Sequence, residues 1–143
     1  PAYSGTRLTD AIGGGVCQGS STLYNCVLLA DLEVVTRSCH GATVAYLPLG
    51  LDAAVNWGTT DFQFRNNFHF PVKIEAETTV DLVKMRILGT DEKDYYIEMT
   101  SGYDDSREDV IYAGSYKNKY SKETGELISK DREAFSTYYR NVG

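Results

Sequence analysis

Only one stretch of this sequence has the spacing of an α-helix, and that limits the folds that its 143 residues can adopt. Leu23, Val27, Leu28 and Leu32 follow the three-and-four spacing of an apolar helix face, after a run of three glycines that breaks the chain. We therefore predict one helix, from about Cys17 to Leu32.

The rest of the sequence has the short apolar runs and alternating patterns that are typical of β-strands. These patterns predict strands at Val44–Leu47, Ala53–Trp57, Phe62–Arg65, Pro71–Ala76, Thr79–Leu88, Tyr95–Met99, Val110–Tyr120 and Leu127–Tyr139. A change of phase within Thr79–Leu88 indicates a β-bulge, and Thr124-Gly125 has the composition of a hairpin tip. The predicted fold class is α+β: one main N-terminal helix, carrying a cysteine at its start, packed on a mostly antiparallel β-sheet with a β-rich C-terminal half.

Composition predicts a single domain with its chemistry in the first half. With 42% apolar residues, the chain can bury one hydrophobic core but is short for two. We expect one domain over residues 1–143, with a catalytic core at about 1–75 and a β-rich part at about 76–143. Residues 1–70 carry 3 basic and 5 acidic side chains against 11 and 15 in residues 71–143, yet they hold all three cysteines and both histidines.

Charge and hydropathy restrict the partners. The formal net charge of −6 argues against nucleic acid or an anionic membrane as the principal partner. No apolar run approaches the ~18 residues of a membrane-spanning helix. The chain starts at Pro1 without a charged and then apolar leader, which suggests a soluble piece of a longer protein.

Three cysteines do not make a disulfide framework. An odd number leaves at least one thiol free, and none of Cys17, Cys26 and Cys39 has the pair spacing of a zinc site, so no metal is expected. Cys26 lies among apolar residues and is expected in the core. Cys39 could serve as a resolving thiol in redox chemistry.

Cys17 has the strongest local signal for chemistry, because it follows the glycine run at the predicted start of the helix. Unpaired N–H groups and the positive end of the helix dipole would stabilise a thiolate there. The backbone N–H groups of Gly14, Gly15 and Val16 could also hold an oxyanion. The alternatives are a buried structural cysteine or, more weakly, a phosphate-binding glycine loop that lacks its usual Lys-Ser/Thr ending.

A nucleophilic thiol needs a base, and His40 lies just ahead of a predicted strand that could return to the helix. Asp52, in a predicted turn, could orient His40. Both residues also have plainer interpretations, His40 as a surface or capping residue and Asp52 as a turn residue. His69, in a polar turn, is expected in solvent.

The residues around Cys17 resemble the signature of the VanW domain family. The string is Gly13-Gly14-Gly15-Val16-Cys17-Gln18, followed by Ser20-Ser21-Thr22-Leu23-Tyr24-Asn25. Later landmarks of the same pattern are, in order, His40, Tyr46, Pro48, Gly50, Asp52-Ala53 and Phe64-Arg65-Asn66-Asn67. The resemblance spans about residues 5–75.

The resemblance implies an extracytoplasmic L,D-transpeptidase of peptidoglycan, without a cofactor, anchored by an N-terminal membrane segment that this chain lacks. Cys17 would attack the carbonyl of the third residue of a tetrapeptide stem and expel the terminal D-Ala, with His40 as base. The amine of a neighbouring stem would form a 3-3 crosslink, or water would complete a carboxypeptidase reaction. Gln18 would donate a hydrogen bond near the thiol, and Arg65 would pair with a stem carboxylate or close a structural ion pair.

Two alternatives to this function remain open on the sequence. The same thiol and base would suit another cysteine amidase or endopeptidase of peptidoglycan. A non-catalytic cell-wall-binding module would instead use Cys17 for packing and the tyrosine-rich strands for stacking on glycan or peptide.

Overall fold

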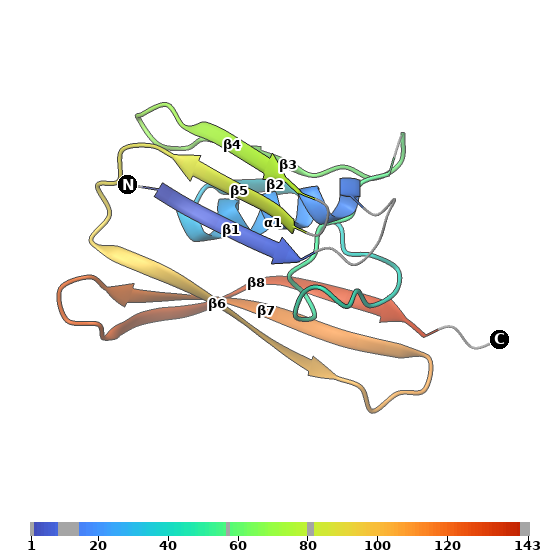
Figure 1. Ribbon diagram of the computed structural model, residues 1–143. Coiled ribbons are helices and arrows are strands. Elements are labelled where there is room, and N and C mark those ends of the chain that lie inside the picture. Colours follow the sequence, from blue (N-terminus) through green and yellow to red (C-terminus); the bar gives the residue numbers. More distant parts are fainter. Residues whose placement is uncertain (1, 9–14, 57, 80–81, 141–143) are drawn as a thin grey trace.

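The computed structural model describes residues 2–8, 15–56, 58–79 and 82–140. These residues form one α-helix and eight β-strands (Figure 1). The elements are β1 (Ala2–Leu8), α1 (Gly15–Ala30), β2 (Glu33–Thr36), β3 (Gln63–Arg65), β4 (Lys73–Thr78), β5 (Leu82–Leu88), β6 (Tyr95–Asp104), β7 (Val110–Ser121) and β8 (Leu127–Tyr139). None of the helical residues described makes a segment with the length and apolarity that a membrane crossing requires.

Three small antiparallel sheets are arranged around the helix. Their strand orders are β1-β5-β4, β2-β3 and β6-β7-β8. In Figure 1, α1 lies behind β1 and β5, and the β6-β7-β8 sheet crosses below them. Because α1 contacts β1, β2, β5 and β6, it is the central element of the fold.

The predicted α+β fold class is wrong. The structure is mostly β, with one short helix and three small sheets rather than one main helix lying on one sheet. The sequence analysis missed β1 and β2, which complete the first two sheets. A helix with one apolar stripe covers one sheet, whereas α1 is buried on almost all sides and needs strands around it.

Apolar packing shows why the helix is central. Between Ser21 and Leu28, every residue except Leu23 is buried. One core cluster joins the helix to β5 and contains Cys26, Val27, Ala30, Leu32 and Ile87. A second cluster joins it to the chain after β2 and contains Tyr24, Leu28, Leu51 and Ala53.

Most local predictions are confirmed. The helix begins two residues before the predicted start and ends two before the predicted end, and β8 has the predicted bounds. β3, β4 and β7 lie within a few residues of their predictions, whereas β6 is longer. Gly125, with φ +74°, lies in the turn between β7 and β8, as the hairpin prediction required.

Two predicted strands and one bulge are wrong. Val44–Leu47 forms turns instead of a strand, and the side chain of Leu47 is buried. Within Ala53–Trp57, residues 53–55 are extended without joining a sheet, and Trp57 lies outside the described residues. β5 keeps a regular register with β1 and β4. The register shifts lie instead between β2 and β3, at Val34/Thr36, and between β7 and β8, at Ser115/Tyr116 and Lys119/Tyr120.

Residues 51–55, which we call the strap, lie antiparallel along α1. Side chains four residues apart on the helix bind alternate residues of the strap, in the pairs Asn25–Leu51 (2.8 Å), Ser21–Ala53 (2.9 and 3.2 Å) and Cys17–Val55 (3.4 Å). Four helical residues rise about 6 Å and two extended residues span about 6.6 Å, so the two repeats stay nearly in step. The helix therefore takes the place of a neighbouring strand.

We expect Ser21→Ala to destabilise the protein by about 1–3 kcal/mol. Ser21 is fully buried, and its Oγ both accepts from Ala53 N and donates to Ala53 O, so the substitution leaves the Ala53 N–H without an acceptor. Urea denaturation would measure the loss. Ser101→Ala, at an exposed position of β6, is the matched control and should change stability by less than about 0.5 kcal/mol. Equal stability of the two variants would contradict the expectation.

Candidate functional site

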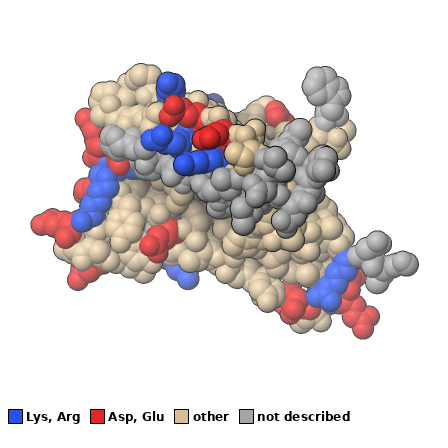
Figure 2. Space-filling model, viewed as in Figure 1, with Lys and Arg blue, Asp and Glu red and all other residues tan. Residues whose placement is uncertain are grey.

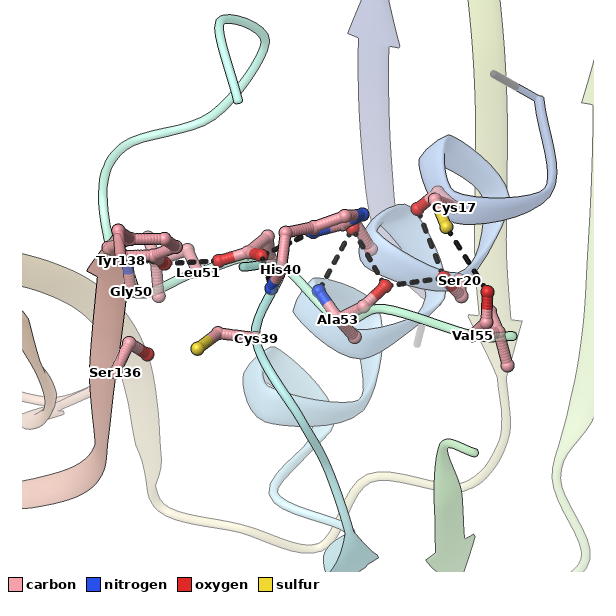
Figure 3. A network of polar contacts seen from close by, with 12 residues as sticks. Cys17, Ser20, Cys39, His40, Gly50, Leu51, Ala53, Val55, Ser136 and Tyr138 are labelled. Atoms are coloured by element: carbon pink, nitrogen blue, oxygen red, sulfur yellow. Dashed lines mark hydrogen bonds and ion pairs between the residues drawn. The ribbon is translucent and has the colours of Figure 1, made fainter. Parts of the chain in front are cut away.

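Cys17 lies in the first turn of α1, which begins at Gly15. N–H groups in this turn have no partner within the helix, and the helix dipole is positive there. The half-buried thiol donates to Val55 O at 3.4 Å, and Ser20 Oγ donates to Cys17 O at 3.0 Å (Figure 3). Ser20 also donates to Ala53 O at 2.6 Å, so both the helix and the strap position the thiol.

His40 lies in the segment after β2 and is held by Asp52 of the strap. Asp52 Oδ2 accepts hydrogen bonds from His40 Nδ1 at 2.5 Å and from His40 N at 2.8 Å. The His40 side chain is 20% exposed and that of Asp52 only 1%. The buried carboxylate thus fixes both the backbone and the ring of His40.

The state of Asp52 decides which nitrogen of His40 carries the proton. Burial acts to raise the pKa of Asp52, but hydrogen bonds from Tyr138 and His40 and the charge of Arg37 outweigh it, and the net pKa lies below its usual 3.8. An ionised carboxylate only accepts, so Nδ1 of His40 donates to it, and in the neutral imidazole the lone pair then lies on Nε2. In Figure 3 the imidazole extends towards the turn of α1 that carries Cys17.

Two further side chains stabilise the charge of Asp52. Arg37 donates from Nε to Asp52 O at 2.8 Å, and its Nη2 lies 3.5 Å from Asp52 Oδ1. Arg37 also donates to Gly50 O at 3.0 Å and to Ser136 Oγ at 2.8 Å. The Tyr138 hydroxyl donates to Asp52 Oδ1. The carboxylate therefore has partners from the segment after β2 and from β8.

Tyr46 links the thiol and the carboxylate. Burial raises the pKa of the Tyr46 hydroxyl, a hydrogen bond with Ser21 opposes this, and electrostatic interactions with Cys17 and Asp52 raise the pKa further. Tyr46 is therefore within electrostatic reach of both groups. The helix, the strap and the turn at Tyr46 converge on one site.

The predicted oxyanion and substrate residues have different surroundings. Gly14 lies outside the described residues, and Gly15 and Val16 form the first turn of α1. Gln18 is 3% exposed, and no hydrogen-bond partner of its Oε1 is found among the described residues. Arg65, on β3, donates to Glu33 Oε2 at 2.9 Å on the exposed surface, which is the ion-pair alternative of the sequence analysis.

The other cysteines and the second histidine lie outside this arrangement. Cys26 is buried in the core, as predicted, and its Sγ donates to Met85 O at 3.4 Å. Cys39 Sγ donates to Thr137 O at 3.5 Å, and all three cysteines are thiols rather than disulfides. His69 is exposed, as predicted. In the described part of the chain, no three His, Cys, Asp or Glu side chains are grouped to hold a metal ion.

Sequence reasoning missed Arg37, Tyr138 and Tyr46 as parts of the site. Arg37 is one of 3 basic residues in the first 70, and this scarcity was a signal that could have marked it. Tyr46 was a landmark of the family pattern without a role. No local signal marks Tyr138, one of 11 tyrosines, 86 residues from Asp52.

A second feature is a cavity of about 530 Å³ that has Arg37 among its lining residues. Residues of α1, β2, β7 and β8 line it, among them Tyr24, Lys117, Glu133 and Phe135. Neither Cys17, His40 nor Asp52 is among the lining residues. This cavity is therefore distinct from the thiol site.

Comparison with models of protein families shows which family the chain belongs to. The family model described as VanW-like protein matches residues 1–88, more than half of the chain. This chain belongs to the VanW-like protein family. The matched residues include Cys17, His40 and Asp52 but not Tyr138. The resemblance inferred from the motif around Cys17 is therefore confirmed.

A relative in this family is YoaR of Bacillus subtilis (strain 168), a protein described as uncharacterized. It is 47% identical to this chain over 71 residues, which are 50% of this chain and 23% of YoaR. The chain thus matches less than a quarter of that relative. No solved structure matches the chain.

We expect Asp52→Asn to lower the free energy of unfolding by about 3–5 kcal/mol at pH 7, because Arg37 would stay buried without its anion. The folded-state pKa of Asp52 is lowered below 3.8, so the wild-type stabilisation is present above that pH and is lost as pH falls through the folded-state pKa. Stability curves of the two proteins should therefore converge in acid. Urea denaturation from pH 7 to pH 2.5 would measure this, with the exposed Asp109→Asn as control. A difference independent of pH would contradict the assignment.

Proposed function

We propose that this protein is a cysteine-dependent L,D-transpeptidase that acts on the stem peptides of peptidoglycan. One observation carries the proposal: Cys17 is fixed at a helix start, and His40 is oriented by a buried carboxylate with its ring directed towards that helix start (Figure 3). A nucleophile, a base and a group that holds the base are the requirements of covalent acyl transfer.

Family membership supports an association with the cell wall. The proposal places the protein in the cell envelope outside the cytoplasm, attached through a membrane segment elsewhere in the full-length protein. Its substrates would be tetrapeptide stems, and the reaction would need no cofactor because thiol and imidazole supply both the nucleophile and the proton transfer.

In the first step, Nε2 of His40 removes the proton from Cys17 Sγ, and the sulfur attacks the carbonyl carbon of the third stem residue. First-turn N–H groups of α1 stabilise the oxyanion that forms. The C–N bond to the terminal D-Ala then breaks, and His40 returns the proton to the leaving amine. The products are a thioester on Cys17 and free D-Ala.

In the second step, the side-chain amine of another stem attacks the thioester. His40 takes a proton from the amine and gives it to the departing sulfur, so a 3-3 amide crosslink forms and the thiol is restored. Water in place of the amine gives a tripeptide acid, which is the carboxypeptidase outcome. The same site thus serves both reactions, depending on which nucleophile reaches the thioester.

A second candidate is a non-catalytic cell-wall-binding module, and the aromatic side chains on the third sheet favour it. Tyr103, Tyr112, Phe135 and Tyr139 are between 43% and 67% exposed. On the face shown in Figure 2, charged side chains lie mostly towards the ends of this sheet, and uncharged side chains cover most of its middle. Exposed aromatic rings suit stacking on glycan or peptide.

We expect intact-protein mass spectrometry with a tetrapeptide stem to detect an adduct equal to the stem minus its terminal D-Ala. Cys17→Ala should abolish the adduct because it removes the nucleophile. Cys39→Ala, at the half-buried thiol next to His40, is the matched control and should retain it. A crosslinked stem dimer in the same reaction would identify the transpeptidase. A folded wild-type protein that binds stem or glycan without an adduct would support the binding module instead.

We expect His40→Gln to reduce kcat for D-Ala release by about 10²- to 10⁴-fold, because the variant cannot transfer the proton. His69→Gln changes the other histidine, which is exposed, and should leave kcat within twofold. Release of D-Ala under single-turnover conditions would measure both variants. Equal rates for His40→Gln and the wild type would exclude His40 as the base.

A further inference from the structure

We propose that Tyr138 is a positioning residue of the Cys17 site: its hydroxyl fixes Asp52, and through Asp52 it holds the His40 ring in place. Its link to catalysis rests on the proposed function. Tyr138 lies on β8. The family model matches residues 1–88, so Tyr138 lies outside the matched part of the chain. The inference is that the C-terminal sheet completes the site.

The contacts of Tyr138 are specific and fully buried. Its side chain is 1% exposed. Its hydroxyl donates a hydrogen bond to Asp52 Oδ1 and accepts one from Gly50 N at 2.8 Å. Burial, followed by the interaction with Asp52, raises the pKa of the phenol far above its usual value, so it stays a donor. Asp52 Oδ1 has Tyr138 and Arg37 as its partners, while Oδ2 faces His40.

The end of β8 is fixed against the segment that carries His40. Ser136 Oγ accepts from Arg37, Thr137 O accepts from the Cys39 thiol, and Tyr139 N donates to Gly41 O. Three residues near the end of β8 therefore contact residues on both sides of His40. These contacts fix the position of the Tyr138 hydroxyl relative to the His40 backbone. The Asp52 carboxylate hydrogen-bonds to both.

A positioning role predicts an effect on His40 that a purely structural role does not. Without the Tyr138 hydroxyl, Asp52 Oδ1 would keep only the longer Arg37 contact at 3.5 Å. The carboxylate could then rotate, and the Nδ1 bond that sets the His40 tautomer would change. Reorientation of a base lowers the rate of the chemical step more than it alters substrate binding.

The experiment compares Tyr138→Phe with the wild type by NMR of ¹⁵N-labelled histidine and by stem-peptide kinetics. The chain has 2 histidines, so His40 and His69 are readily distinguished. We expect the ring nitrogen signals of His40 to shift while those of His69 do not, and kcat to fall about tenfold with KM within twofold. Tyr96→Phe, at a 42% exposed position of β6, is the control and should leave the signals and kcat unchanged.

Unchanged His40 signals in a folded Tyr138→Phe variant would overturn the proposal. The NMR measurement needs no turnover, so it tests Tyr138 even if the wild type does not act on stem peptides, which would overturn the proposed function alone. If Tyr138→Phe does not fold, 3-fluorotyrosine incorporated at position 138 keeps the donor and makes it more acidic. A shift of the His40 signals in that protein supports the proposal, and unshifted signals overturn it.

Discussion

The buried charge of Asp52 is the constraint on which the arrangement of this protein depends. A carboxylate removed from water costs several kcal/mol unless nearby groups compensate it. Here the compensation comes from Arg37, His40 and Tyr138, which belong to the segment after β2 and to the last strand. Folding can bury Asp52 only when these elements meet, so one charge joins parts of the chain that lie far apart in sequence.

The strap makes this meeting possible because its backbone is bonded along both edges. Polar groups of residues 51, 53 and 55 face side chains of α1, while Asp52 O and Ala54 N bind Arg37 and Ser38 O on the other edge. An extended chain alternates its hydrogen-bonding groups in this way. The strap therefore behaves as a strand between α1 and the segment after β2, although it belongs to none of the three sheets. It also binds the Cys17 thiol through Val55 O and His40 through the Asp52 side chain.

This arrangement separates the tasks of the site among rigid elements. The thiol lies on the buried central helix, His40 is held by backbone and side-chain bonds to one carboxylate, and that carboxylate is fixed from β8. Sites of this kind depend on supporting residues as much as on those that react. The family match, at residues 1–88, covers Cys17, His40 and Asp52, whereas Tyr138, which binds Asp52, lies on the sheet beyond it.

The sequence by itself determined the local features. Helical spacing located α1, alternation located most of the strands, and the glycine run followed by Cys17 marked the helix start. His40 and Asp52 were identified by their chemistry, and the structure brings them together. These features depend on neighbouring residues, whose propensities and spacing are visible in the sequence.

Only the tertiary structure decided the rest. The apolar run at Val44–Leu47 forms turns, and the run after Ala53 binds side chains of a helix, because the partner of an extended segment is not encoded locally. The same reason hides Tyr138. Alternation along β8 places Ser136 and Tyr138 on one face of the strand, but only long-range packing brings that face to the buried charge of Asp52.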